Sequence, residues 1–278
     1  MIAAAPLSLA DALRAIADDP FATVIAGGTD LMVQINAGRR PVTSLVSLRN
    51  VAELKGWSTE SGNLRIGAGC SYSELERPDF AAIMPALAQA ARTVGSPQIR
   101  NAGTIGGNLA TASPAGDTLP VLVALDAQLE IASSSATRSI AISDFLVGPK
   151  QTDLRQGELI VAISVPVLRG AQEFLKVGTR NAMVISVASV AVLADLDAQG
   201  VRIGLGTVGP TVLRGARAEA WTRSNIDWDS NRVVGNLDEF VALVRSDSHP
   251  IDDHRSTKRY RSHAIGICAR RALQRVFP

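Results

Sequence analysis

A Gly-Gly pair occurs twice in the chain, and these two pairs are the feature that most constrains its fold. The first glycine segment is IAGGTDLM, residues 25–32, between a strand-like apolar run and a helix-like stretch. The second glycine segment is RNAGTIGGNLATASPAGD, residues 100–117, which has four glycines, one acid and neither histidine nor cysteine. Glycine has no side chain, so a ligand can approach the backbone closely. Where a strand turns into a helix, unsatisfied N–H groups and a positive dipole end favour anions.

The two glycine segments together predict a site for a diphosphate. Gly103, Gly106 and Gly107 permit positive φ angles, and Asn108 can hydrogen-bond a phosphate or its own backbone. Asp117, the only carboxylate of the second segment, could accept a ribose hydroxyl. We expect this segment to form a long irregular loop, which inside a compact domain is usually functional. Exposed N–H groups of both segments would then hold one diphosphate. A tight strand-to-helix turn and an ordinary glycine-rich connector are the alternatives.

Apolar periodicity predicts an α+β chain with a change of organisation near residue 170. Before it we expect helices over about 8–16, 31–38, 84–94 and 118–127, and strands over about 21–25, 41–48, 64–69, 127–133, 138–142 and 158–166. After it we expect a long hairpin over about 184–208 that turns at 198–200, and helices over about 214–221, 237–245 and 257–276. This predicts two subdomains, about 1–55 and 56–170, followed by a C-terminal domain, 171–278.

Composition excludes several classes of protein. The 278 residues carry a net charge of +2 without a basic stripe, so nucleic acid is not an expected partner. The longest apolar run, from Val184, is too short to span a bilayer, and the N-terminus lacks the pattern of a secretory signal. Cys70 and Cys268 are isolated, so we expect no disulfide framework, and no iron–sulfur cluster held by this chain's thiolates alone. We therefore expect a soluble, cytoplasmic protein.

Other motifs are weaker. GLGTVG, residues 204–209, fits the dinucleotide pattern GxGxxG, but Pro210 follows where a helix should already be running, so we favour a hairpin strand. The three histidines do not form a metal-ligand pattern, and no GxSxG nucleophile motif exists. The charged stretch DDHRSTKRYR, residues 252–261, is typical of a solvated helix start.

Five segments in order along the chain resemble one family. They are AGGTDL, RNAGTIGGNLATASPAGD, DFLVGPKQTDLRQGELI, FLKVGTRNAMVISVASVAV and YRSHAIGICARRAL. The chain resembles the FAD-binding medium subunit of molybdenum hydroxylases, the family of carbon monoxide, nicotinate and xanthine dehydrogenases. The resemblance implies a PCMH-type flavin-binding fold of two α+β subdomains, similar to vanillyl-alcohol oxidase. It also implies a C-terminal α+β domain of antiparallel sheet and helices.

The resemblance implies a set of cofactor-binding residues and neither a catalytic side chain nor a metal ligand. Along the FAD pyrophosphate it places Ile25, Ala26, Gly27, Gly28, Thr29, Asp30, Leu31 and Met32, and on the other side Thr104, Ile105, Gly106, Gly107 and Asn108. It places Val94 and Asp117 against the cofactor, and Ile160 and Lys176 near the flavin. Ile160 could instead be a plain core strand residue, and Lys176 a surface lysine.

The resemblance also implies a function. Electrons from a molybdopterin large subunit would pass through [2Fe–2S] clusters of a small subunit to the FAD, and then to NAD, quinone, cytochrome or oxygen. The assembly would be a heterotrimer or its dimer, and its organic substrate would bind elsewhere. A self-contained FAD oxidase of the same fold and a nucleotide-binding regulatory module are the alternatives.

Overall fold

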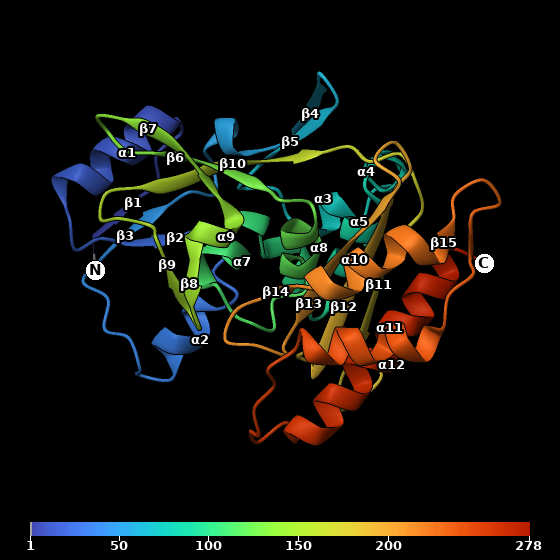
Figure 1. Ribbon diagram of the computed structural model, residues 1–278. Coiled ribbons are helices and arrows are strands. Elements are labelled where there is room, and N and C mark those ends of the chain that lie inside the picture. The colour runs from blue at the N-terminus through green and yellow to red at the C-terminus, as the bar shows by residue number, and fades with distance from the viewer. Residues whose placement is uncertain (1) are drawn as a thin grey trace.

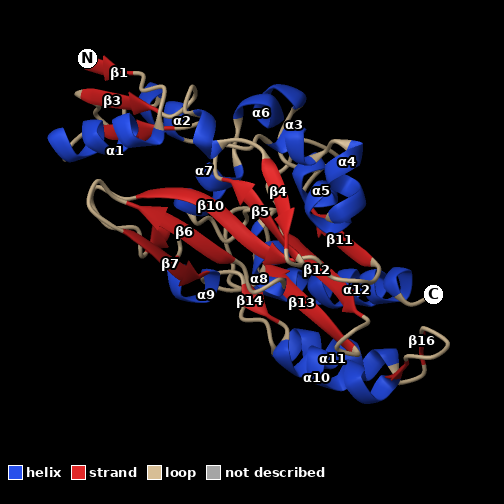
Figure 2. Ribbon diagram, turned by 90° about the horizontal axis from the view of Figure 1, so that it is seen from above, coloured by secondary structure: helices blue, strands red, loops and turns tan. Residues whose placement is uncertain are grey.

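Three main sheets follow one another across the molecule in the computed structural model, which describes residues 2–278 (Figures 1 and 2). A small parallel sheet lies at the N-terminal side, a five-stranded antiparallel sheet in the middle, and a four-stranded antiparallel sheet towards the C-terminal side. The two ends of the chain therefore lie on opposite sides of the molecule.

The N-terminal sheet has the strand order β1-β3-β2, with all pairs parallel. Its elements are β1 (Ile2–Ala4), α1 (Leu9–Asp18), β2 (Thr23–Ile25), α2 (Leu31–Asn36) and β3 (Ser44–Ser47). The Ser8 hydroxyl accepts the Asp11 N–H and caps α1, whose apolar face is buried as predicted. The strand expected from Phe21 begins only at Thr23, and Phe21 is 85% exposed.

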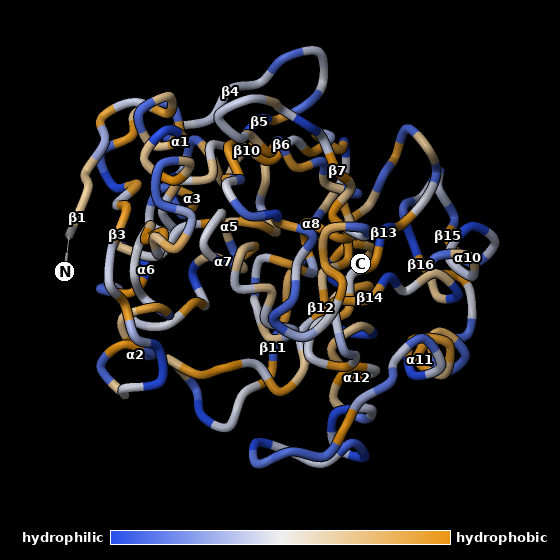
Figure 3. Tube along the Cα trace, turned by 90° about the vertical axis from the view of Figure 1, so that its left-hand side faces the viewer, coloured by the Kyte–Doolittle hydropathy of each residue, from blue (hydrophilic) through white to orange (hydrophobic). Residues whose placement is uncertain are grey.

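The middle sheet has the order β4-β5-β10-β6-β7. Its strands are β4 (Trp57–Glu60), β5 (Asn63–Gly67), β6 (Gln128–Ala132), β7 (Thr137–Ala141) and β10 (Leu159–Pro166). β10 is central and almost wholly buried, which explains its continuous apolar sequence. The short elements η1 (Ala52–Leu54), α9 (Ile142–Phe145), β8 (Leu146–Gly148) and β9 (Gln151–Thr152) lie at its margins. The β4–β5 turn is hydrophilic and projects from the molecule (Figure 3).

Six short helices lie between β5 and β6. They are α3 (Tyr72–Leu75), α4 (Pro78–Ile83), α5 (Pro85–Arg92), α6 (Pro97–Ala102), α7 (Ile105–Thr111) and α8 (Leu119–Ala124). The expectation of a long irregular loop over residues 100–117 is wrong, because this stretch holds the end of α6 and the whole of α7. Thr104 caps α7, and Ala112 ends it with a left-handed φ of 46°.

The C-terminal sheet has the order β11-β12-β13-β14. Its strands are β11 (Gln172–Val177), β12 (Ala188–Asp195), β13 (Gly200–Gly206) and β14 (Leu213–Arg214), and its helices are α10 (Ala216–Asn225), α11 (Leu237–Ser246) and α12 (Lys258–Val276). The hairpin β15 (Ile226–Asp227) and β16 (Arg232–Val233) joins α10 to α11. The predicted β12–β13 hairpin is confirmed. GLGTVG begins in β13 and is not a dinucleotide turn. Its first glycine, Gly204, packs against Pro120. A Cβ on Gly204 would lie 1.9 Å from the Pro120 carbonyl oxygen.

The charged stretch DDHRSTKRYR, residues 252–261, runs into the first turn of α12 and is less solvated than predicted. Arg261 is 1% exposed. Its guanidinium donates to the carbonyl oxygens of Val187 (2.8 Å) and Thr207 (3.1 Å) and to the Asp253 carboxylate (2.7 Å). The arginine therefore fastens the start of α12 to the C-terminal sheet, because a buried guanidinium needs such acceptors.

Candidate cofactor site

The two glycine segments lie in direct backbone contact. A Cβ on Gly27 would be 1.9 Å from the carbonyl oxygen of Ala102 and 2.8 Å from the Cα of Gly103. A Cβ on Gly103 would be 3.2 Å from the Thr29 hydroxyl. The end of β2 and the α6–α7 junction therefore form one continuous backbone surface, as the sequence predicts.

The backbone donors of the second segment are already used within the protein. The N–H groups of Ile105 and Gly106 donate to the carbonyl oxygens of Cys70 (3.0 Å) and Ala68 (2.8 Å). The Gly107 N–H donates to the Thr104 hydroxyl (3.0 Å). The expectation that this segment supplies exposed N–H groups to a diphosphate is therefore wrong for these three residues, because the neighbouring β5–α3 connection already satisfies two of them.

The first segment, in contrast, keeps its donors free. Within residues 2–278, no acceptor lies within hydrogen-bond range of the N–H groups of Gly27, Gly28 and Thr29. These three residues are partly exposed, so water or a ligand reaches them. Gly28 has a φ of +72°, which turns the chain and favours glycine. The free backbone donors next to the contact between the two segments therefore belong to the strand-to-helix turn after β2.

Gly103 and Gly106 of the second segment allow neighbouring parts of the chain to pack closely, and none of Gly103, Gly106 and Gly107 has a positive φ angle. The expectation of positive φ angles at these glycines is therefore also wrong. Positive φ angles occur at seven other glycines, and not at Gly103, Gly106 or Gly107. A Cβ on Gly106 would lie 2.6 Å from the Ala68 carbonyl oxygen. A Cβ on Gly107 would have only the Thr104 hydroxyl within 4 Å. The Gly107 face of α7 therefore borders open space. A ligand could lie against this face, whereas a larger side chain at position 107 would exclude it.

Asp117 and Lys176 form a buried ion pair, 2.6 Å from Oδ2 to Nζ, with side chains 7% and 10% exposed. Lys176 also donates to the carbonyl oxygens of Thr93 (2.9 Å) and Val184 (3.1 Å), and Asp117 Oδ1 accepts the Ser186 hydroxyl (2.5 Å). Burial raises the pKa of the Asp117 carboxyl, and the Lys176 ammonium opposes that shift. Lys176 is thus not the surface lysine of the alternative interpretation.

Other predicted residues are more loosely connected to the site. The Asn108 side-chain oxygen accepts the Thr118 hydroxyl (2.6 Å), which leaves its amide NH₂ as the donor for a ligand. Val94 is half-buried against the main core. Ile160 is 6% exposed in that core, as the alternative of a plain strand residue expects, and the register with β6 shifts between Ile160 and Ala162. The flavin contacts of Val94 and Ile160 stay predictions.

Thr104 offers a test of the second segment alone. Thr104→Val is expected to lower the free energy of unfolding by about 1 kcal/mol, since the Gly107 N–H loses its acceptor. Urea unfolding of the cofactor-free protein measures this. Thr137→Val, at an exposed position of β7, is the control and is expected to stay within about 0.5 kcal/mol of the wild type. Equal midpoints for all three proteins would contradict the capping role.

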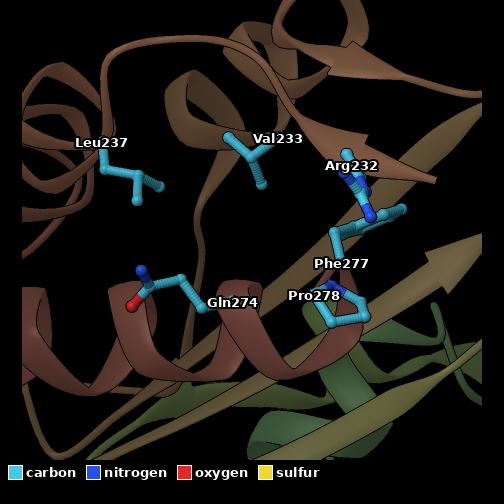
Figure 4. A pocket seen from close by; sticks show the side chains of 6 residues that line it. All are labelled: Arg232, Val233, Leu237, Gln274, Phe277 and Pro278. Atoms are coloured by element: carbon cyan, nitrogen blue, oxygen red, sulfur yellow. The ribbon is translucent and has the colours of Figure 1, made fainter. Parts of the chain in front are cut away.

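One cavity lies far from the predicted residues. It measures about 370 Å³ and opens between α11, the β15–β16 hairpin and the end of α12 (Figure 4). Its lining residues are Arg232, Val233, Leu237, Gln274, Phe277 and Pro278. None of them belongs to either glycine segment.

No three His, Cys, Asp or Glu side chains within residues 2–278 cluster as a metal site would require. Both cysteines are buried and free. No helix in this part of the chain is long and apolar enough to cross a membrane.

Comparisons with known proteins identify the family. The family model described as "FAD binding domain in molybdopterin dehydrogenase" matches residues 3–168, and "CO dehydrogenase flavoprotein C-terminal domain" matches residues 173–276. The xanthine dehydrogenase FAD-binding subunit of Escherichia coli O157:H7 is 32% identical over 96% of this chain and 92% of its own length. The carbon monoxide dehydrogenase medium chain of Afipia carboxidovorans is 30% identical over 97% and 94%.

Solved structures agree with this fold. Quinoline 2-oxidoreductase from Pseudomonas putida 86 matches with a TM-score of 0.88 and 27% identity, covering 99% of this chain and 96% of the other. Reconstituted CO dehydrogenase from Oligotropha carboxidovorans matches with a TM-score of 0.88 and 28% identity, covering 99% and 97%. The predicted fold class and the FAD cofactor are thereby confirmed. The chain belongs to the FAD-binding medium subunits of the molybdenum hydroxylases, which are parts of oxidoreductases.

Proposed function

We propose that the turn after β2 holds the FAD diphosphate, with the Gly107 face of α7 as the opposite wall. The observation that carries this proposal is the set of free N–H groups at Gly27, Gly28 and Thr29, in contact with the second segment. Backbone donors of this kind suit phosphate oxygens without requiring a lysine. Gly107 also fits this proposal, because outside its own helix only the Thr104 hydroxyl lies within 4 Å of an added Cβ, which leaves room for a ligand.

The remaining predicted residues would surround this diphosphate. Asp30, Leu31 and Met32 begin α2 directly after the turn, and Ile25 and Ala26 precede it. Asp117 and Lys176 would orient the flavin ring of the cofactor. Their side chains are held in place by hydrogen bonds to the Ser186 hydroxyl and to two carbonyl oxygens. A positive charge held at this place can stabilise negative charge on a neighbouring group.

We propose that the subunit transfers electrons between protein partners and an external acceptor. The FAD supplies the redox chemistry when bound, and the protein supplies position and electrostatics. The donor would be the [2Fe–2S] small subunit, which receives electrons from the molybdopterin large subunit in a heterotrimer or its dimer. The medium-chain relatives support an assembly of several subunits. The expected division into domains at residue 170, with subdomains 1–55 and 56–170, and the cytoplasmic location stay predictions.

The proposal predicts that the expressed chain carries FAD without its partners. The purified protein is expected to show the visible absorption of an oxidised flavin, and acid extraction to release FAD and not FMN. A protein that cannot be loaded with any flavin would contradict the proposed site.

The self-contained oxidase is separated by a second measurement. Alcohols and amines are not expected to bleach the flavin of the isolated subunit, since Asp117 and Lys176 are buried and paired with each other and so are poorly placed to act as an acid or a base on a substrate. Addition of a reduced [2Fe–2S] partner is expected to bleach it. Bleaching by a small alcohol or amine alone would favour the oxidase.

A further inference from the structure

Tyr72 lies against the second glycine segment of the proposed cofactor site, and the sequence does not single it out. It is the first residue of α3, whose cap Ser71 forms a reciprocal pair with Glu74. The Tyr72 N–H donates to the Gly103 carbonyl oxygen (3.1 Å), and the Ile105 N–H donates to the Cys70 carbonyl oxygen (3.0 Å). These two hydrogen bonds fasten the start of α3 to the second glycine segment.

The tyrosine ring occupies space that the missing side chain of Gly103 leaves. Tyr72 Cε2 would be 2.8 Å from a Cβ on Gly103, and the Thr29 hydroxyl would be 3.2 Å from the same point. Tyr72 and the first segment therefore flank the same residue. The ring is 4% exposed, so its position is fixed by packing.

The hydroxyl of Tyr72 has no hydrogen-bond partner within residues 2–278, although the residue is buried. Its oxygen is nevertheless not fully enclosed, so a small polar partner can reach it. Burial raises the pKa of the phenol, and the Asp117 carboxylate raises it further. The phenol is therefore a neutral hydrogen-bond donor near Asp117. Buried polar groups normally have a partner, so an unpaired one that a partner can still reach points to a missing ligand.

We propose that Tyr72 positions the cofactor, its hydroxyl donating to an oxygen of the ribityl chain that links the diphosphate to the flavin ring. This inference rests on the proposed FAD site. Tyr72 contacts Gly103 of the second glycine segment, and its phenol lies near enough to the Asp117 carboxylate, which pairs with Lys176, to feel that charge. A ribityl chain that runs from a diphosphate at the glycine segments towards Asp117 would come near the phenol, and a ribityl hydroxyl oxygen can accept a hydrogen bond from it.

Tyr72→Phe tests the inference, because it keeps the ring and removes only the hydroxyl. The dissociation constant of FAD, measured by titrating the cofactor-free full chain, is expected to rise about three- to tenfold, the loss of one neutral hydrogen bond. The dissociation constant of ADP, which has the diphosphate but no ribityl chain, is expected to be unchanged. Thermal unfolding of the cofactor-free variant is expected to match the wild type, whereas a purely structural tyrosine would lower it.

Tyr260→Phe is the matched control. It removes the same hydroxyl from the other tyrosine of the chain, which is 49% exposed on α12, and is expected to leave both dissociation constants unchanged. An unchanged FAD constant in Tyr72→Phe would overturn the inference and leave the proposed function intact. FAD and ADP constants that rise together would overturn the ribityl assignment. A wild-type chain that binds no FAD would overturn the proposed site, and the role of Tyr72 with it.

Discussion

Gly27→Val is expected to raise the FAD dissociation constant by at least about 100-fold, because it drives the two glycine segments apart. The new Cβ would lie 1.9 Å from the Ala102 carbonyl oxygen and 2.6 Å from its carbon. Both are backbone atoms, so no side-chain rotation can relieve the clash. The turn after β2 must then move away from the α6–α7 junction, and its three free N–H groups lose their position beside the second glycine segment. Flavin content after purification and FAD titration both measure the effect.

The same substitution is expected to cost about 1–3 kcal/mol of stability, the usual cost of overpacking. Gly200→Val is the control, because a Cβ there meets nothing closer than the Ala198 carbonyl oxygen at 3.9 Å. We expect the control to keep wild-type flavin content. If Gly27→Val also kept it, the contact between the segments would be irrelevant to the cofactor.

Lys176→Met is expected to have the largest effect on stability, about 3–5 kcal/mol, because it leaves the buried Asp117 carboxylate without its counter-charge. Chemical denaturation of the cofactor-free protein near neutral pH measures this. The double variant Lys176→Met with Asp117→Asn removes the uncompensated charge and is expected to recover a large part of the loss. A single variant as stable as the wild type would show that the pair contributes nothing.

The loss in Lys176→Met should depend on pH in a defined direction. Without the lysine, burial alone raises the Asp117 pKa in the folded protein above its unfolded value. Between these two pKa values the folded state binds a proton that the unfolded state does not, so stability rises as the pH falls through the folded pKa. The deficit relative to the wild type is therefore greatest above the folded pKa and shrinks on acidification. A deficit that grows towards acid pH would contradict this assignment.

Regular elements with strong periodicity could be predicted from the sequence. The amphipathic α1 and the β12–β13 hairpin follow their patterns, since each buries one face or all of its length. Residues 100–117 were harder to predict, because their glycines and small residues suggest a loop. Thr104 supplies a helix cap there, and the packing of Gly106 on Ala68 supports the helix from outside the segment.

The chemistry of the site could be predicted only in part. The contact between the glycine segments follows from the absence of side chains, which the sequence shows directly. The N–H groups of Ile105 and Gly106 are not free, because the carbonyl oxygens of Cys70 and Ala68 accept them. These two acceptors lie more than thirty positions earlier in the chain. Likewise, Asp117 pairs with Lys176, which lies on β11 of the C-terminal sheet. Tyr72, at the start of α3, packs against Gly103. Such partners are set by tertiary packing, and no local pattern encodes them.

The free backbone amides after β2 are proposed to hold the diphosphate of FAD. A crystal structure of the FAD-loaded subunit would show whether they do. We predict phosphate oxygens at hydrogen-bond distance, about 2.7–3.2 Å, from the backbone nitrogens of at least two of Gly27, Gly28 and Thr29. The diphosphate should also lie against Gly107. A diphosphate bound elsewhere, with these amides facing only water, would contradict the claim.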